Sequence, residues 1–325
     1  YYLMLSSGDY IVNTGSLSGG QLIATANGNI TNGDSGTMTG TSGLSLTSGG
    51  KIRNEEKASL LSNNQIAATA IGDFLNEGKI SAKHTSLTFV GDSFKNTGNI
   101  NSTGQTTIQS LTQDGSANTG EIYNLGNITG ENINLQTNGT LAQSSSGRIE
   151  ATNAITAHSY WLNQNGYMNA ADITTDHGVV NNYGNITAKN ISITTYSDIT
   201  NEGQISSTGD LILNTKNKGA IYNYSTLSAG GNMTLTATKV VNAKTGAREN
   251  AALALRSLAS PDGKLDAKAL LNAAKSMQTH LNRLGTLGEI RGTMDDAVIA
   301  AFAPEVESLS NTELLNAYQQ FLSPE

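Results

Sequence analysis

The chain has 325 residues, with 35 glycines, three prolines, no cysteine and only 14% charged residues. Without cysteine it can form neither a disulfide framework nor a thiolate metal site. Its net charge of −7 argues against a surface that binds nucleic-acid phosphates. Its apolar runs are far shorter than the roughly 20 residues that span a bilayer. The first ten residues carry no initiator Met and no signal-peptide pattern, so we expect an internal fragment of a longer protein.

The composition changes sharply near Gly246. Of the 35 glycines, 31 lie at or before this residue, whereas all three prolines follow it. Charged residues occupy 28 of the first 246 positions and 17 of the last 79. We therefore predict two domains, one rich in Gly, Asn, Thr and Ser at residues 1–246 and an α-helical one at residues 247–325.

A short unit, Asn-x-Gly-x-Ile, recurs through the first region. Its clearest asparagine and glycine positions are Asn76 and Gly78, Asn96 and Gly98, Asn124 and Gly126, Asn182 and Gly184, and Asn201 and Gly203. Between the units lie short segments in which apolar and polar residues alternate, such as residues 44–46, 87–89, 133–135, 191–193 and 211–213. Such alternation is typical of strands that bury one face.

The apolar anchors of these units recur every 18 to 22 residues, with one insertion near residues 114–128. Three short strands and three turns fit a coil of this length, but a four-stranded propeller blade does not. The leucine-rich repeat signature is missing. We predict a mainly β fold at residues 1–246, a right-handed parallel β-helix of about eleven coils. In the turns, Asn and Gly are expected because both tolerate a positive φ, and stacked turns allow buried Asn side chains to form ladders.

The second region carries helix signals. We predict helices at residues 248–259, 265–284, 297–302 and 314–322, which would form a small bundle, complete or truncated. We also expect this segment to pack on the last coil, near residues 233–241, because the open end of a solenoid needs a cap.

Few residues suggest catalysis. The four histidines show no spacing of a metal site, so we predict no catalytic residue, no metal site and no cofactor. The alternative is a carbohydrate-active β-helix, such as a polysaccharide lyase or a tailspike-like depolymerase. Glycoside hydrolysis would need two carboxyl groups about 5–10 Å apart. The candidate carboxylates for such a site are Asp172, Asp176, Asp198, Glu202 and Asp210.

One stretch is a candidate partner-binding surface. It contains the aromatic pair Tyr160 and Trp161, followed by Asp172, Asp176 and His177. Trp161 also fits a core or edge position, and His177 also fits a solvated turn.

Residues 201–213 contain the sequence Asn-Glu-Gly-Gln-Ile, and residues 221–237 contain Gly-Gly-Asn-Met-Thr-Leu. These repeats resemble those of filamentous haemagglutinin-like exoproteins of Gram-negative bacteria. The resemblance covers about residues 10–245. It implies secretion through an outer-membrane two-partner-secretion transporter and display as a fibre at the cell surface. Such fibres serve adhesion or virulence, or deliver a toxin in contact-dependent growth inhibition. The family's amino-terminal Asn-Pro motifs cannot occur before Pro261, so we expect an internal or late section of such an exoprotein.

We therefore expect a structural stalk or adhesin segment rather than an enzyme. By the resemblance, its partners are the transporter and a protein or glycan receptor on a target cell, with no nucleic acid and no membrane insertion of this fragment. A third interpretation makes residues 247–325 a binding or effector domain, with the β-helix as its handle.

Overall fold

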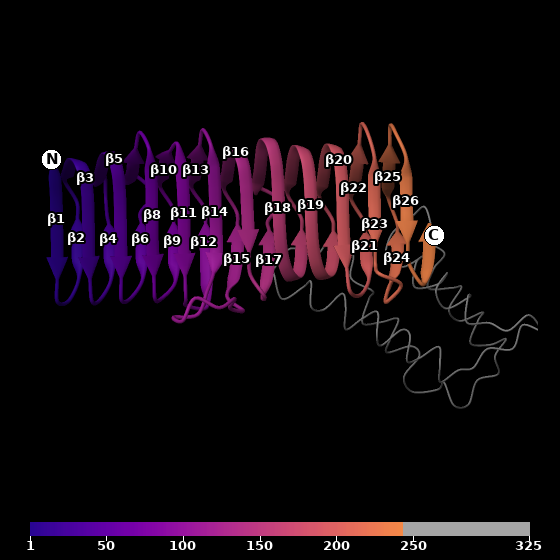
Figure 1. The fold of residues 1–325 in the computed structure, drawn as a ribbon, viewed down its shortest axis with the longest axis horizontal. Helices are drawn as coiled ribbons and strands as arrows, with labels where there is room; N and C mark the ends of the chain where they lie inside the picture. Colours follow the sequence, from indigo (N-terminus) through magenta and orange to yellow (C-terminus); the bar gives the residue numbers. More distant parts are fainter. Residues whose placement is uncertain (243–325) are drawn as a thin grey trace, which may run out of the picture. The chain divides into compact units, whose positions relative to one another are not determined.

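The computed structural model describes residues 1–242, and within them the chain is a parallel β-solenoid of about 12 turns. Each strand pairs in parallel with the equivalent strand of the next coil (Figure 1). The predicted fold class is thus confirmed for this part of the chain. There is one turn more than the anchor spacing predicts, because residues 2–13 already contribute two strands. The predicted helices at 247–325 and their contact with the last coil lie outside the described residues.

Three faces surround the core, and we number them in the order in which the chain runs through a complete coil. Face 1 holds β7 (Ser59–Ser62), β10 (Lys79–Ala82), β13 (Asn99–Ser102), β22 (Gln204–Ser207) and β25 (Thr226–Ala229). Face 2 holds β1 (Tyr2–Ser7), β8 (Gln65–Ala70), β11 (His84–Phe89), β14 (Gln105–Ser110), β23 (Leu211–Asn214) and β26 (Met233–Thr236). Face 3 holds β2 (Ile11–Asn13), β4 (Ile30–Asn32), β6 (Ile52–Asn54), β9 (Phe74–Asn76), β12 (Ser93–Asn96), β15 (Glu121–Asn124), β17 (Thr140–Gln143), β21 (Ile199–Asn201), β24 (Ala220–Asn223) and β27 (Lys239–Asn242).

In several coils one strand bends across two or three faces. Faces 1 and 2 are joined in β3 (Ser16–Ala26), β5 (Thr37–Ser48), β16 (Asn127–Gln136) and β20 (Asn185–Thr195). All three faces are joined in β18 (Arg148–Gln164) and β19 (Tyr167–Asn182). The turns of these coils are therefore short, and the corner side chains stay close to the body of the solenoid.

The core is a stack of identical layers. On face 1, for example, Leu60, Ile80, Ile100 and Ile128 follow one another in register, and all are fully buried. On face 3, Phe74 stacks near Phe94 with ring centroids 5.3 Å apart. Burying each such side chain stabilises the fold by about 1.5–3 kcal/mol. Because the layers stack in register, the buried side chains form one continuous core along the solenoid.

A buried ladder of amides accompanies this core along face 3. In most coils the asparagine donates from Nδ2 to the Oδ1 of the equivalent asparagine one coil on, over 2.7–3.0 Å. The bonded pairs join Asn13, Asn32, Asn54, Asn76, Asn96 and Asn124 in one run and, in the second run, Asn182 with Asn201 and Asn223 with Asn242. The same Nδ2 groups also donate to carbonyls of the turns, as Asn76 does to Gly78 O at 3.2 Å. Every rung thus satisfies amides that burial would otherwise penalise.

The repeat glycines have a different role from the one that the sequence suggests. None of them adopts a positive φ; among the described glycines only Gly115 does, in the inserted loop. A Cβ at Gly98 would instead collide with the carbonyl oxygen of Gly78, and one at Gly126 with that of Gly98. Close stacking of turns, not left-handed backbone, therefore requires glycine here.

The one insertion forms a loop between β14 and β15 (Figure 1). Leu111 and Ala117 form an isolated antiparallel bridge at its base. At its tip the Asp114 carboxylate accepts bonds from the hydroxyls of Thr112 and Ser116, which lower its pKa to about 2. The added residues thus stay outside the solenoid and leave its register intact.

The ladder is interrupted between its two runs. Gln143 and Gln164 occupy the ladder position in the two intervening coils. Gln143 donates to Tyr167 O at 2.8 Å, but its Oε1, both polar atoms of the Gln164 amide and Oδ1 of Asn182 are buried without a hydrogen-bond partner. The glutamine side chain is one carbon longer than that of asparagine, so its amide does not lie in line with the ladder. These two coils therefore lack the side-chain hydrogen bonds that join the asparagines of the other coils.

Substituting Asn76→Ala should destabilise the fold by about 1–3 kcal/mol, because it leaves Oδ1 of Asn96 buried without a donor. The free energy of unfolding in urea measures the effect. Asn185→Ala is the matched control, since Asn185 is exposed on β20, and should cost about 0.5 kcal/mol or less. Equal losses in the two variants would show that the ladder contributes nothing specific.

Substituting Gln164→Asn should stabilise the fold by about 1 kcal/mol, because it restores an Asn-x-Gly unit and supplies a donor for Oδ1 of Asn182. Gln164→Ala serves as the comparison, since it removes the unsatisfied amide but gives Asn182 no partner. A thermal midpoint that is no higher for Gln164→Asn than for Gln164→Ala would contradict this account.

Candidate functional site

A groove of about 690 Å³ runs across four successive coils, where face 1 bends into face 2. Its lining residues are Asn101, Ser102, Thr103, Thr129, Gly130, Glu131, Glu150, Ala151, Thr152, Asn169, Ala170 and Ala171. They come from four short segments that lie next to one another only because the coils stack. This groove is the candidate site.

Register explains which side chains line the groove. Asn101 pairs with Thr129, Thr129 with Glu150, and Glu150 with Asn169, so these four form one outward-facing column. The inward positions that follow are small, namely Ser102, Gly130, Ala151 and Ala170. Small residues at the bend leave space that a larger corner residue would fill.

The bend is also irregular in this part of the solenoid. The pairing register shifts between Gly130 and Asn132 in β16 and between Glu150 and Ala154 in β18. Such bulges redirect side chains and interrupt the ladder of backbone bonds. Glu131 lies at the first of these shifts and is exposed.

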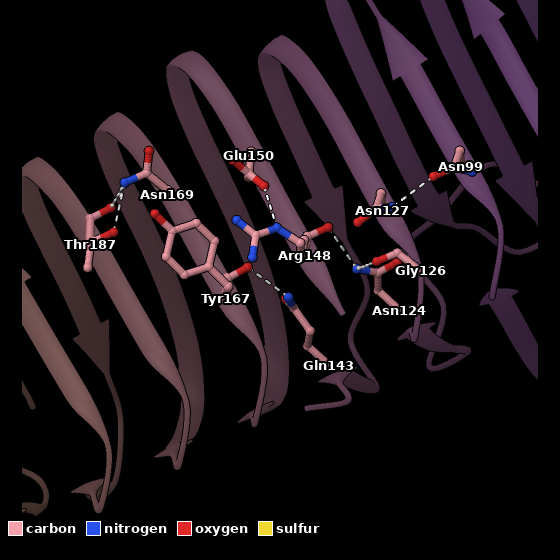
Figure 2. A network of polar contacts seen from close by, with 10 residues as sticks. All are labelled: Asn99, Asn124, Gly126, Asn127, Gln143, Arg148, Glu150, Tyr167, Asn169 and Thr187. Atoms are coloured by element: carbon pink, nitrogen blue, oxygen red, sulfur yellow. Dashed lines mark hydrogen bonds and ion pairs between the residues drawn. The ribbon is translucent and has the colours of Figure 1, made fainter. Parts of the chain in front are cut away.

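A charged cluster borders the groove on face 1 (Figure 2). The Arg148 guanidinium donates from Nε to Oε1 of Glu150 at 2.6 Å and lies 4.3 Å from the centroid of the Tyr167 ring. The hydrogen bond to Glu150 raises the pKa of Arg148. Arg148 is therefore held in place, and it fixes one oxygen of the Glu150 carboxylate.

The inner ladder supports this cluster from below (Figure 2). Asn124 donates to the carbonyl oxygen of Arg148 at 3.1 Å, and Gln143 donates to that of Tyr167 at 2.8 Å. The strands that carry the outer cluster are thereby anchored to buried amides, which limits the positions that the groove side chains can take.

Several polar atoms of the groove remain uncommitted. Asn101 uses Oδ1 to accept from Thr129, and Asn169 uses Nδ2 to donate to the hydroxyl and carbonyl of Thr187. Within residues 1–242 no hydrogen bond engages Nδ2 of Asn101, Oδ1 of Asn169, Oε2 of Glu150 or the carboxylate of Glu131. The hydroxyls of Thr103 and Thr152 are likewise not engaged within these residues, so the free groups include donors as well as acceptors.

Neither a metal centre nor a membrane span is found in the described part of the chain. Residues 1–242 contain no group of three His, Asp or Glu side chains that could hold a metal ion. No helix among the described residues is long and apolar enough to cross a bilayer.

The predicted surface residues lie on the paired strands β18 and β19, but they do not all face outward. Tyr160 is exposed and contacts Trp161 edge to face, with centroids 5.2 Å apart, where face 2 turns into face 3. Asp172 and Asp176 lie on the outer side of face 2, where Asp172 accepts from Asn190 and Oδ2 of Asp176 lies 3.7 Å from Nδ1 of His158.

His177 is not on the surface, and its expected place in a surface site is wrong. It points inward because it follows the outward-facing Asp176 along the strand, and it is only 1% exposed. Ser159 donates to Trp161 O at 2.9 Å, so its oxygen accepts from Nδ1 of His177 at 2.7 Å. Nε2 of His177 has no hydrogen-bond partner, and burial lowers the pKa of this histidine to about 3.

The remaining candidate carboxylates are spread around the coils. Asp198 accepts from the backbone N–H of Ala220, beside face 3. Glu202 lies in the turn after β21, where burial raises its pKa to about 7. Asp210 precedes β23 on face 2 and accepts from the backbone N–H of Asn232. The structure places Asp172 and Asp210 in one column, two coils apart with the Asn190 side chain bonded to both, and distributes the other candidates elsewhere.

The groove residues were not identified from the sequence. Their signal is positional: residues 101, 129, 150 and 169 hold the same place in four consecutive repeats. Only an alignment of the repeats that allows for the inserted loop would have placed them in one column.

Compared with known proteins, the chain matches no family model, no curated protein and no solved structure.

The buried histidine leads to a pH prediction. Its pKa is lowered from 6.5 to about 3, so the folded state excludes a proton that the unfolded chain binds. Above pH 6.5 the histidine is neutral in both the folded and the unfolded state and contributes no pH dependence. Stability is lost as pH falls from 6.5 toward 3, by about 1.4 kcal/mol per pH unit. His177→Thr, which copies Thr195 in the next coil, should remove this loss.

The measurement is the difference in unfolding free energy between wild type and His177→Thr at pH 7 and at pH 4. The outer carboxylates contribute equally to both proteins and cancel. The variant should gain about 3 kcal/mol relative to wild type on going to pH 4. Parallel pH profiles would contradict the buried, neutral state of His177.

Proposed function

We propose that residues 1–242 form a structural stalk or adhesin segment of a large secreted bacterial exoprotein, which presents a receptor-binding or toxin-delivery module at a cell surface. The observation that carries this proposal is the solenoid of about 12 turns with its shared core. At about 4.8 Å per coil it extends over roughly 55 Å. Each added coil lengthens such a solenoid, so its length can increase by repetition of one structural unit.

The repeat pattern supports this choice of protein class. The Asn-x-Gly units that resemble filamentous haemagglutinin-like exoproteins are the units whose asparagines bond to one another inside the solenoid. A β-solenoid is compatible with a fragment of such an exoprotein. By the same resemblance, an outer-membrane transporter would secrete it, and a protein or glycan on a target cell would be its receptor.

The carbohydrate-cleaving alternative receives less support. It requires two carboxyl groups about 5–10 Å apart. Asp172 and Asp176 are four residues apart on one strand, which corresponds to about 13 Å, and Asp198 and Glu202 lie on either side of β21. Asp172 and Asp210 are two coils apart, about 10 Å, and the Asn190 side chain between them bonds to both. No observation favours cleavage by these residues over a scaffold.

Display at the surface can be tested on intact cells of the source organism. Antibodies raised against residues 1–242 should label these cells before permeabilisation, because the proposed stalk lies outside the outer membrane. Labelling that appears only after permeabilisation would contradict the proposal, with an antibody to a cytosolic protein as the control.

A scaffold should also tolerate the loss of one repeat. Deleting residues 77–96 removes one coil and joins Asn76 to Thr97 in the same register. Surface labelling should then match wild type, whereas deleting residues 77–86 breaks the register and should abolish it. Loss of labelling in both deletions would count against a repeat-built stalk.

A further inference from the structure

We propose that the groove between faces 1 and 2 binds an uncharged oligosaccharide, which lies along the axis of the solenoid across the four coils from β13 to β19. This inference extends the proposed function, because a stalk with its own ligand groove acts as an adhesin along its side. It concerns the isolated protein and does not depend on where the protein is displayed.

Hydrogen-bonding capacity selects the class of ligand. The uncommitted acceptors are Oδ1 of Asn169, Oε2 of Glu150 and both oxygens of Glu131. The uncommitted donors are the two N–H bonds of Asn101 Nδ2 and the hydroxyls of Thr103 and Thr152, which also accept. A matching ligand must donate and accept several hydrogen bonds without carrying charge, and a chain of sugar rings with free hydroxyls does so.

Charge disfavours acidic polymers. The residues that line the groove include two carboxylates and no lysine or arginine. Arg148, which borders the groove, is engaged by Glu150 and by the Tyr167 ring. Lys83 and Lys189 hold the corresponding corner position in the coils before and after the groove. A sulfated, phosphorylated or uronic-acid chain would therefore meet carboxylates along the groove and cations only at its two ends.

A basic peptide fits less well than a neutral saccharide. One of the two carboxylates, Glu150, already has its ion-pair partner in Arg148 at 2.6 Å. That leaves a net charge of about −1, and exposed ion pairs of this kind contribute little affinity. Several directional hydrogen bonds, rather than charge, are what this groove offers.

Shape agrees with an extended, repeating ligand. The volume of about 690 Å³ falls within the range of ligand sites. Side chains at equivalent positions recur at about 4.8 Å intervals along the groove, the separation of neighbouring strands. A polymer of similar units can place successive units against successive coils, which a compact ligand cannot.

The full chain can be tested by calorimetry against three probes. These are a neutral hexasaccharide of glucose or N-acetylglucosamine, a heparin-derived hexasaccharide and a lysine hexapeptide. The neutral probe should bind, and the other two should not. Combining Asn101→Ala, Glu131→Ala and Asn169→Ala should weaken neutral binding by about tenfold or more, since several hydrogen bonds to the ligand are lost.

A second variant controls for an effect of the substitutions on folding. Asn185→Ala with Glu56→Ala removes the same kinds of exposed side chain outside the groove and should leave the affinity unchanged. Circular dichroism should show equal strand content in both variants. The proposal is overturned by absence of neutral binding, by preference for the acidic probe or the peptide, or by equal affinity of the groove variant and wild type.

Discussion

In-register stacking of successive coils is the constraint on which the rest of this structure depends. Each residue lies directly on its equivalent in the next coil, so a side chain that suits one coil must suit its copies. Asparagine satisfies this condition on face 3, because one amide both donates along the ladder and accepts from it. Glycine satisfies it in the turns, where the carbonyl of the coil below occupies the space of a Cβ. The absence of proline from the solenoid has the same origin, since nearly every strand donates to one neighbour and accepts from another.

Several departures from this regularity lie close together. The glutamines that interrupt the ladder, the buried His177 and the bulges beside Glu131 and Glu150 all lie between residues 130 and 182. The groove occupies part of the same segment, and Gln143 bonds to the strand of Tyr167. The irregular buried amides and the outer groove are therefore connected through backbone carbonyls. A change in the ladder at Gln143 would alter the position of the outer cluster.

Much of the fold could be predicted from the sequence, because the Asn-x-Gly units mark the period and alternation marks the strands. It was harder to predict which side of a strand a particular residue faces. His177 was assigned to a surface because it follows an aspartate, yet one residue along a strand reverses the side on which a side chain lies. Its alignment with Ser159 and Thr195, both inward, shows the correct phase. The glycines were explained by φ because sequence alone gives no distance to the turn below. The groove was missed because it belongs to no single segment.

A solenoid can acquire a distinct binding site only by departing from its repeat. Identical coils expose identical columns, and a uniform column of hydroxyls or amides has no preferred place for a ligand. Here the outward column changes from Asn101 to Thr129, then to Glu150 and Asn169, while bulges add Glu131 and Thr152 beside it. The side chains differ, but their spacing is still that of the backbone ladder. The groove thus combines a fixed interval, which suits a repeating ligand, with local chemistry that gives the ligand one register.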